Sequence, residues 1–293
     1  MKNVATFSIV AYDPQRKEWG VAVQSKFLAV GAVVPWAQAG AGAVATQSYA
    51  NLAYGPGGLE RMASGQTAEA SLAALVRDDP GKDTRQVGLV DRQGRAAAFT
   101  GSGCLAWAGH QVGEGYACQG NILVPGTVAA MAQAFEQARD GAGELADWLV
   151  ATLDAGQAAG GDRRGRQAAA VLVVRQGGGY GGNNDRYLDL RVDDHPEPIQ
   201  KLHELLELHH LFFGATDPEK LIPLAGLAAE LQELLRRSGS YQGAVTGALD
   251  AATRQALRDL VSIENLEQRW NGEGDTIDLE VVEFLRRKYP AGG

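Results

Sequence analysis

The order in which strand and helix patterns occur constrains the fold of this sequence more than any other feature. Apolar or alternating runs, which predict strands, come in blocks that are separated by pairs of amphipathic segments, which predict helices. Blocks of strands favour antiparallel sheets, because a doubly wound parallel sheet needs strands and helices in strict alternation. The sequence therefore predicts an α+β fold, a four-layer αββα sandwich in which two stacked sheets lie between helical layers.

The predicted elements can be placed by residue number. Strands are expected at residues 4–12, 19–26, 30–36, 41–48, 86–91, 95–100, 104–109, 115–119, 168–175 and 187–192. Two helices are expected after Gly58, the second at 68–79 with Thr67 as its N-cap, and further helices at 126–140, 143–157 and 197–212. The continuous apolar run at 168–174 is typical of a strand covered on both faces.

A second domain is predicted after Gly214, where the composition changes. Residues 215–293 contain no convincing strand pattern, and leucines repeat at helical spacing from Leu221 to Leu234. Thr216 to Glu219 is expected to start a helix, and residues 250–261 form another amphipathic segment. We expect an αββα domain at 1–213 and a small helical domain at 214–293.

Charge and composition exclude several classes of partner. The net charge of −8 argues against nucleic acid, and no stretch of about 18 apolar residues predicts a membrane span. The first residues lack the pattern of a secretory signal, so a cytoplasmic protein is expected.

Cys104 and Cys118 are then expected to be free thiols, with a disulfide between neighbouring strands as the alternative.

Three residues at the ends of the first two predicted strands form a candidate catalytic group. Thr6 opens the first strand, and Ser25 and Lys26 end the second, so a hairpin would bring them about 5 Å apart. Removal of residues 1–5 would give Thr6 a free α-amino group with a pKa of about 8, able to deprotonate its hydroxyl. Lys26 could lower the pKa of that hydroxyl. The alternative is a threonine that merely favours a strand and a lysine at a solvated strand end.

Two further segments supply candidate site residues. Asn121 ends a predicted strand and could present its amide to an oxyanion, or serve only as a cap or turn residue. Asp162 and Arg163 lie in a glycine-rich loop at 160–165, where they could bind a substrate carboxylate or hold the amine of a nucleophile. A plain loop, or a charge cluster at a strand end, are the alternatives.

The charged segment around Asp189 has two interpretations, an internal network of ion pairs or a metal site. Asp189, Arg191, Asp193, Asp194 and His195 are explained well by an internal network of ion pairs. Two aspartates and a histidine could ligate a metal, but the sequence offers no residues that complete a ligand set. We expect no metal and no cofactor.

Seven separated motifs resemble the prokaryotic family catalogued as domain of unknown function 1028. They are residues 6–11, 19–27, 33–36, 42–47, 120–121, 160–165 and 189–196, within a match of roughly 4–213. That family is similar to the N-terminal nucleophile (Ntn) hydrolases, which have an αββα fold and attack amides with an N-terminal Thr, Ser or Cys. The resemblance implies Thr6 as the nucleophile of an amidohydrolase that acts on a small amide. Lys2 to Ala5 depart from the family pattern, in which threonine follows the initiator methionine.

Residues 235–257 resemble a peptidoglycan-binding-like module, in which a Tyr-x-Gly loop separates two helices. A glycan-binding tail and an interface module are equally open alternatives. The same scaffold could therefore be a non-enzymatic binding protein whose tail recognises glycan or protein. The sequence leaves the choice between a monomer and a homo-oligomer open.

Overall fold

The computed structural model describes residues 6–214 and 216–291, in two compact units. The first unit runs to Leu206 and the second begins at Glu207, inside helix α5 (Pro198–Phe213). The sequence analysis placed the domain boundary after residue 213, at the end of this helix. The predicted removal of residues 1–5 involves a segment that lies outside the described residues.

Two antiparallel sheets form the centre of the first unit. The larger has the strand order β10-β9-β2-β1-β8-β7, and the smaller has the order β3-β4-β5-β6. The strands of the larger sheet are β1 (Thr6–Asp13), β2 (Glu18–Ser25), β7 (Gly109–Gly113), β8 (Tyr116–Asn121), β9 (Ala168–Val174) and β10 (Arg186–Val192). Those of the smaller are β3 (Pro35–Gln38), β4 (Gly42–Ser48), β5 (Arg85–Asp91) and β6 (Ala96–Thr100). Each block of strands in the sequence thus adds neighbours to an antiparallel sheet.

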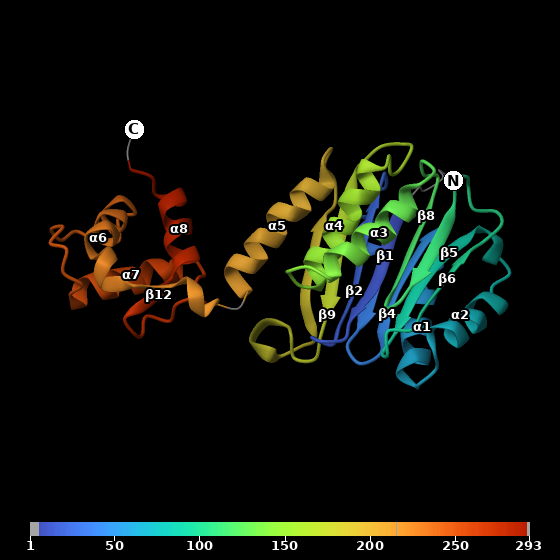
Figure 1. The fold of residues 1–293 in the computed structure, drawn as a ribbon, viewed down its shortest axis with the longest axis horizontal. Coiled ribbons are helices and arrows are strands. Elements are labelled where there is room, and N and C mark those ends of the chain that lie inside the picture. The colour runs from blue at the N-terminus through green and yellow to red at the C-terminus, as the bar shows by residue number, and fades with distance from the viewer. Residues whose placement is uncertain (1–5, 215, 292–293) are drawn as a thin grey trace. The chain divides into compact units, whose positions relative to one another are not determined.

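Helices cover the outer face of each sheet (Figure 1). Helices α3 (Thr127–Arg139) and α4 (Leu145–Ala158) lie on the larger sheet, and α1 (Tyr54–Ala63) and α2 (Ala68–Arg77) lie on the smaller. The alternation of side chains in β1 explains the layering, because Phe7 and Ile9 join the core under α3 and α4. Val10 faces the other way, into the core between the two sheets. The predicted four-layer αββα sandwich is confirmed.

Two predicted strands are wrong. In the run 30–36, residues Val30–Ala32 form a 3₁₀ turn and only Pro35–Gln38 pair as β3. Val30 is apolar because it packs into the core between the sheets, so apolarity there reflects burial and not an extended backbone. Residues 104–108 are loop, and the carbonyls of Leu105 and Trp107 accept from the residues that follow β8.

The second unit is helical with a small sheet. Besides the end of α5, its helices are α6 (Ala228–Arg237), α7 (Ala251–Ile263) and α8 (Leu279–Lys288), around a leucine-rich core. Strands β11 (Leu221–Pro223) and β12 (Thr276–Asp278) pair, which corrects the expectation of no strands after residue 215. Asp217 caps only a short 3₁₀ turn, because Pro218 to Lys220 lead directly into β11.

Two sequence expectations concern the environment of the protein. Cys104 and Cys118 are both free thiols. Within residues 6–214 and 216–291, no helix has both the length and the apolar character that crossing a bilayer requires.

Gly55 provides a test of the packing between α1 and β3. A Cβ at this position would lie 2.2 Å from Cδ2 of Trp36, a rigid ring carbon. We expect Gly55→Ala to lower the free energy of unfolding by about 2–3 kcal/mol, because the indole must shift. Gly57→Ala is the matched control on the same helix, since its nearest neighbour is Leu75 Cδ2 at 3.3 Å. Urea denaturation of both variants measures the difference, and equal losses would contradict this packing.

Candidate active site

Thr6, Ser25 and Asn121 lie side by side on three neighbouring strands. Thr6 is the first residue of β1, and its register partners are Ser25 in β2 and Asn121 in β8. Directly opposed residues of an antiparallel sheet point to the same face, so the three side chains share one surface. Thr6 Oγ1 lies 3.0 Å from Ser25 Oγ, in a hydrogen bond that either hydroxyl can donate. The two hydroxyls that the sequence proposed are therefore in direct contact.

A buried layer of amides holds this surface against the smaller sheet. Ser8, two residues after Thr6, donates to Gln47 Oε1 at 2.6 Å and accepts from Gln119 Nε2 at 2.7 Å. Gln47, from β4, also donates to the carbonyl oxygen of Thr6 at 3.4 Å. The backbone of Thr6 is therefore fixed from the opposite sheet, and its side chain faces the space between the sheets.

Asn121 belongs to the same amide layer. Its Nδ2 donates to Gln86 Oε1 at 3.0 Å, and Gln86 Nε2 donates to the carbonyl oxygen of Gly120 at 2.7 Å. Asn121 Oδ1 is buried and has no hydrogen-bond partner among the described residues. Asn121 is next to Thr6 but is not among the residues that line the cleft described next. Its role at an oxyanion stays a prediction.

Thr6 lines a cleft of about 870 Å³. Its side chain is buried, yet it forms part of the wall of this open space. The other lining residues come from the connection after β2, the end of β4, the start of β5 and the loop before β9. They are Lys26, Phe27, Leu28, Val30, Val33, Val34, Gln47, Ser48, Tyr49, Ala50, Arg85, Arg164 and Gln167. A cleft of this size accommodates a small molecule.

The glycine-rich loop reaches the cleft through a different arginine from the one predicted. Asp162 is buried and forms an ion pair with Arg164 at 2.9 Å, whereas Arg163 is the arginine that the sequence suggested as a binding residue beside Asp162. Asp162 Oδ1 accepts from the backbone N–H of Arg164, and this tight turn folds the Arg164 side chain back over the carboxylate. Arg163 is exposed, and its backbone N–H donates to the carbonyl of Ile122.

Lys26 lies at the rim of the cleft and is held by the same loop. Its backbone N–H donates to Asp162 Oδ2 at 2.8 Å, and its ammonium donates to the carbonyl oxygen of Arg166 at 3.2 Å. The ammonium therefore has a neutral partner, and its assignment as a group that tunes Thr6 stays a prediction. Ser25, the preceding residue, is the one that contacts the hydroxyl of Thr6.

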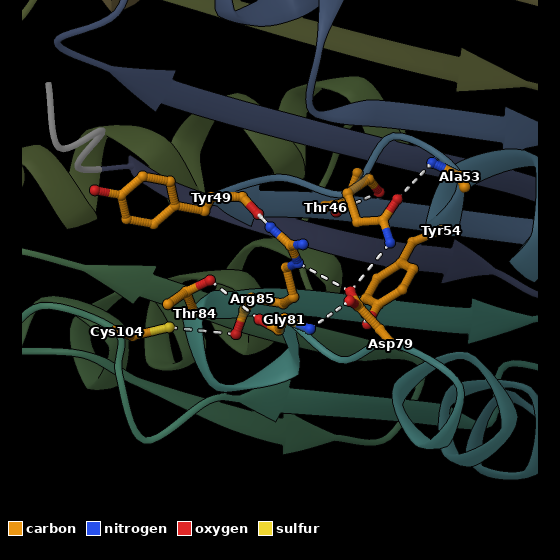
Figure 2. Close-up of polar contacts among 10 residues, drawn as sticks. Thr46, Tyr49, Ala53, Tyr54, Asp79, Gly81, Thr84, Arg85 and Cys104 are labelled. Carbon is orange, nitrogen blue, oxygen red and sulfur yellow. Dashed lines mark hydrogen bonds and ion pairs between the residues drawn. The ribbon is translucent and has the colours of Figure 1, made fainter. Parts of the chain in front are cut away.

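Arg85, which the sequence did not single out, lines the cleft from the start of β5. Its Nε donates to Asp79 Oδ2 at 2.9 Å and its Nη1 to the carbonyl oxygen of Tyr49 at 2.5 Å (Figure 2). Asp79 belongs to a turn that follows α2 and looks in sequence like an ordinary helix end. In the sequence, the signal for Asp79 is its position before Pro80 and Gly81. This position does not identify the cation with which Asp79 pairs.

Asp79 is the centre of a dense hydrogen-bond cluster. Besides Arg85, it accepts from Asn51 Nδ2 at 3.0 Å, from the hydroxyl of Tyr54 at 2.9 Å and from the N–H of Gly81 at 2.7 Å. The hydrogen bond from Arg85, with the others, holds the pKa of the Asp79 carboxyl well below its usual range. Asp79 is therefore a charged anchor that fixes Arg85 at the cleft.

The charged segment around Asp189 contributes no residue to the cleft lining. Arg191 forms an ion pair with Asp189 at 2.7 Å, and neither residue lines the cleft. Residues 6–214 and 216–291 contain no group of three or more His, Cys, Asp or Glu side chains placed to hold a metal ion.

Comparison with known proteins identifies related sequences for both units. A model described as "Family of unknown function (DUF1028)" matches residues 6–202, and one described as "Putative peptidoglycan binding domain" matches residues 212–285. The chain is similar to the crystal structure of protein SPO2555 from Silicibacter pomeroyi, titled as a member of the first family. The TM-score is 0.63 and the identity 29%, over 70% of this chain and 89% of the other. Among curated proteins, none matches.

Proposed function

Because the chain belongs to a family of unknown function, DUF1028, its activity must be argued from its own site, and we propose an amide hydrolase of the N-terminal nucleophile type. Thr6 is the nucleophile, and removal of residues 1–5 activates it. The observation that supports this proposal is the position of Thr6 Oγ1, 3.0 Å from Ser25 Oγ, on a residue that lines the cleft. Because Thr6 is the first residue of a central strand, its backbone is rigid. Its hydroxyl has access to a small substrate.

The proposed reaction follows from the freed amine. The α-amino group of Thr6 takes the proton of its own hydroxyl while Oγ1 attacks the amide carbonyl carbon. The C–N bond of the substrate then breaks, the proton passes to the leaving amine, and an acyl ester remains on Thr6. Water attacks this ester in the second step, releases the carboxylic acid and restores the hydroxyl.

The neighbours of Thr6 have supporting roles in this proposal. The Ser25 hydroxyl can pass or hold a proton through its contact with Thr6 Oγ1. Asn121, beside Thr6 in the sheet, is the candidate amide for the developing oxyanion. Lys26 contributes positive charge in the same cleft, which favours anionic groups there. The free thiols of Cys104 and Cys118 support a cytosolic location, which we propose together with this activity.

The experiment is a comparison of chains that differ only at the N-terminus. One begins at Thr6, one begins at Ala5 as the matched control, and the third is the full chain. Each is incubated with p-nitroanilides of short acids that have neutral, anionic or cationic acyl groups. We expect the chain that begins at Thr6 to hydrolyse at least one anilide about 100-fold faster than the other two. Equal rates for the three chains would refute the role of the terminal amine.

A second candidate function concerns the second unit alone and is an alternative to the cytosolic location proposed above, because peptidoglycan lies outside the cytosol. We propose that it binds peptidoglycan, because the matching model covers residues 212–285 and carries that description. Co-sedimentation of the full chain with insoluble peptidoglycan tests this, with insoluble cellulose as the control polymer. Retention on peptidoglycan alone is expected, and equal retention on both or on neither would leave an interface module as the better description.

A further inference from the structure

The charged side chains that line the cleft all have one sign. They are Lys26, Arg85 and Arg164, and no aspartate or glutamate is among the lining residues that the structure describes. We propose, on the basis of the proposed function, that the substrate is an amide whose acyl chain carries a carboxylate, and that Lys26 binds this carboxylate. The proposal extends the hydrolase assignment from a small amide to an anionic one.

The counter-ions of the two arginines lie outside the lining. Asp79 pairs with Arg85 and Asp162 pairs with Arg164, and both carboxylates are buried, with 7% and 0% of their side chains exposed. Each guanidinium is therefore fixed in place by a buried partner while it lines the cleft. Such an arrangement positions cations without placing a carboxylate where it would repel an anionic ligand.

Lys26 is the cation of the cleft with no carboxylate partner. Its ammonium donates to the neutral carbonyl of Arg166, and it forms no ion pair within the part of the chain that the structure describes. An ammonium has three N–H donors, so a substrate oxygen can be accepted without breaking this bond. Because no carboxylate among the described residues pairs with this ammonium, it is the preferred contact for a substrate carboxylate.

An apolar wall adjoins these cations. It is formed by Phe27, Leu28, Val30 and Val33, and Leu28 is 58% exposed. An exposed leucine beside a cleft offers surface that a short hydrocarbon chain can cover. The lining therefore fits a carboxylate that is separated from the amide by a few methylene groups, as in a monoamide of a short dicarboxylic acid.

The test uses two anilides of equal chain length and the full chain with Thr6→Val, so that no turnover is needed. Glutaric acid monoanilide carries the carboxylate, and pentanoic acid anilide is its neutral counterpart. Calorimetric titration should give about tenfold tighter binding of the glutaric compound, as expected for one partly exposed charge-assisted contact. Added salt should weaken this preference, because a partly exposed ion pair is screened.

Two substitutions complete the test. Lys26→Met should reduce the preference to less than about twofold, whereas Lys201→Met, an exposed lysine on α5, should leave it unchanged. Equal binding of the two anilides, no binding of either, or a preference that survives Lys26→Met would overturn the inference. A failed hydrolase assignment would look different, because the binding preference would persist while the chain beginning at Thr6 hydrolysed neither compound.

Discussion

Thr6→Ala in the chain that begins at residue 6 should abolish amide hydrolysis, with a loss of at least about 1,000-fold in kcat. The substitution removes Oγ1, the atom that would form the acyl ester, while the strand β1 and its pairs with Ser25 and Asn121 remain. Steady-state kinetics with the best anilide of the panel measures the loss. The effect should fall on kcat, because the other residues that line the cleft and bind the substrate are unchanged.

The controls for this prediction separate chemistry from folding. Thr6→Ser keeps a hydroxyl and should retain measurable turnover, and Thr276→Ala, an exposed threonine of the second unit, should behave as the unsubstituted chain. Unfolding curves recorded in parallel show whether each variant is folded. Undiminished turnover in Thr6→Ala would remove this residue from the mechanism.

Asp79→Ala should be the most destabilising of the substitutions considered, with a loss of about 3–4 kcal/mol in the free energy of unfolding at neutral pH. The carboxylate accepts from Arg85, Asn51, Tyr54 and Gly81, so its removal leaves a cation and several donors without their acceptor (Figure 2). Chemical denaturation measures the change.

The adjacent residue is the matched control. Asp78→Ala should leave the free energy of unfolding nearly unchanged, because Asp78 pairs with Arg77 on the exposed surface. An equal loss in the free energy of unfolding for both variants would mean that the hydrogen bonds of Asp79 stabilise the fold no more than an exposed ion pair does.

The stabilisation by Asp79 should depend on pH in one direction. Its pKa is lowered on folding, chiefly by the hydrogen bond from Arg85, so the folded state favours the ionised carboxylate. The contribution is therefore fully present above the unfolded pKa of about 4 and is lost as the pH falls below that value. The difference in stability between the unsubstituted chain and Asp79→Ala should shrink from pH 6 to roughly pH 3. A constant difference over this range would contradict the assignment.

The layers of the fold could be predicted from the sequence, because they depend on the order of elements and on burial. Phe7 and Ile9 alternate with Ser8 and Val10, which is enough to predict a strand with two different covered faces. Two strands were wrong because an apolar run marks burial and not conformation. At 30–36 the backbone turns after Ala29, which has a left-handed φ of 53°, and Val30 is buried from within a turn.

The local part of the site could also be predicted, and the distant part could not. The hairpin of β1 and β2 places Ser25 opposite Thr6, because a short turn fixes the register. No local rule joins Asp79 to Arg85, because the turn after α2 brings them together only in the folded chain. The pairing of Asp162 with Arg164 depends on the turn in which Asp162 Oδ1 accepts from the backbone N–H of Arg164, and the residue types alone do not show this turn.

The most direct measurement of the central claim is the site of acylation by a β-lactone. Attack by Thr6 Oγ1 on the lactone carbonyl opens the ring and leaves an ester, so the chain that begins at Thr6 should gain the mass of one intact lactone. Tandem mass spectrometry should place this mass on Thr6, and Thr6→Ala should remain unmodified. An adduct at another residue, or an unmodified chain that still hydrolyses amides, would contradict the account.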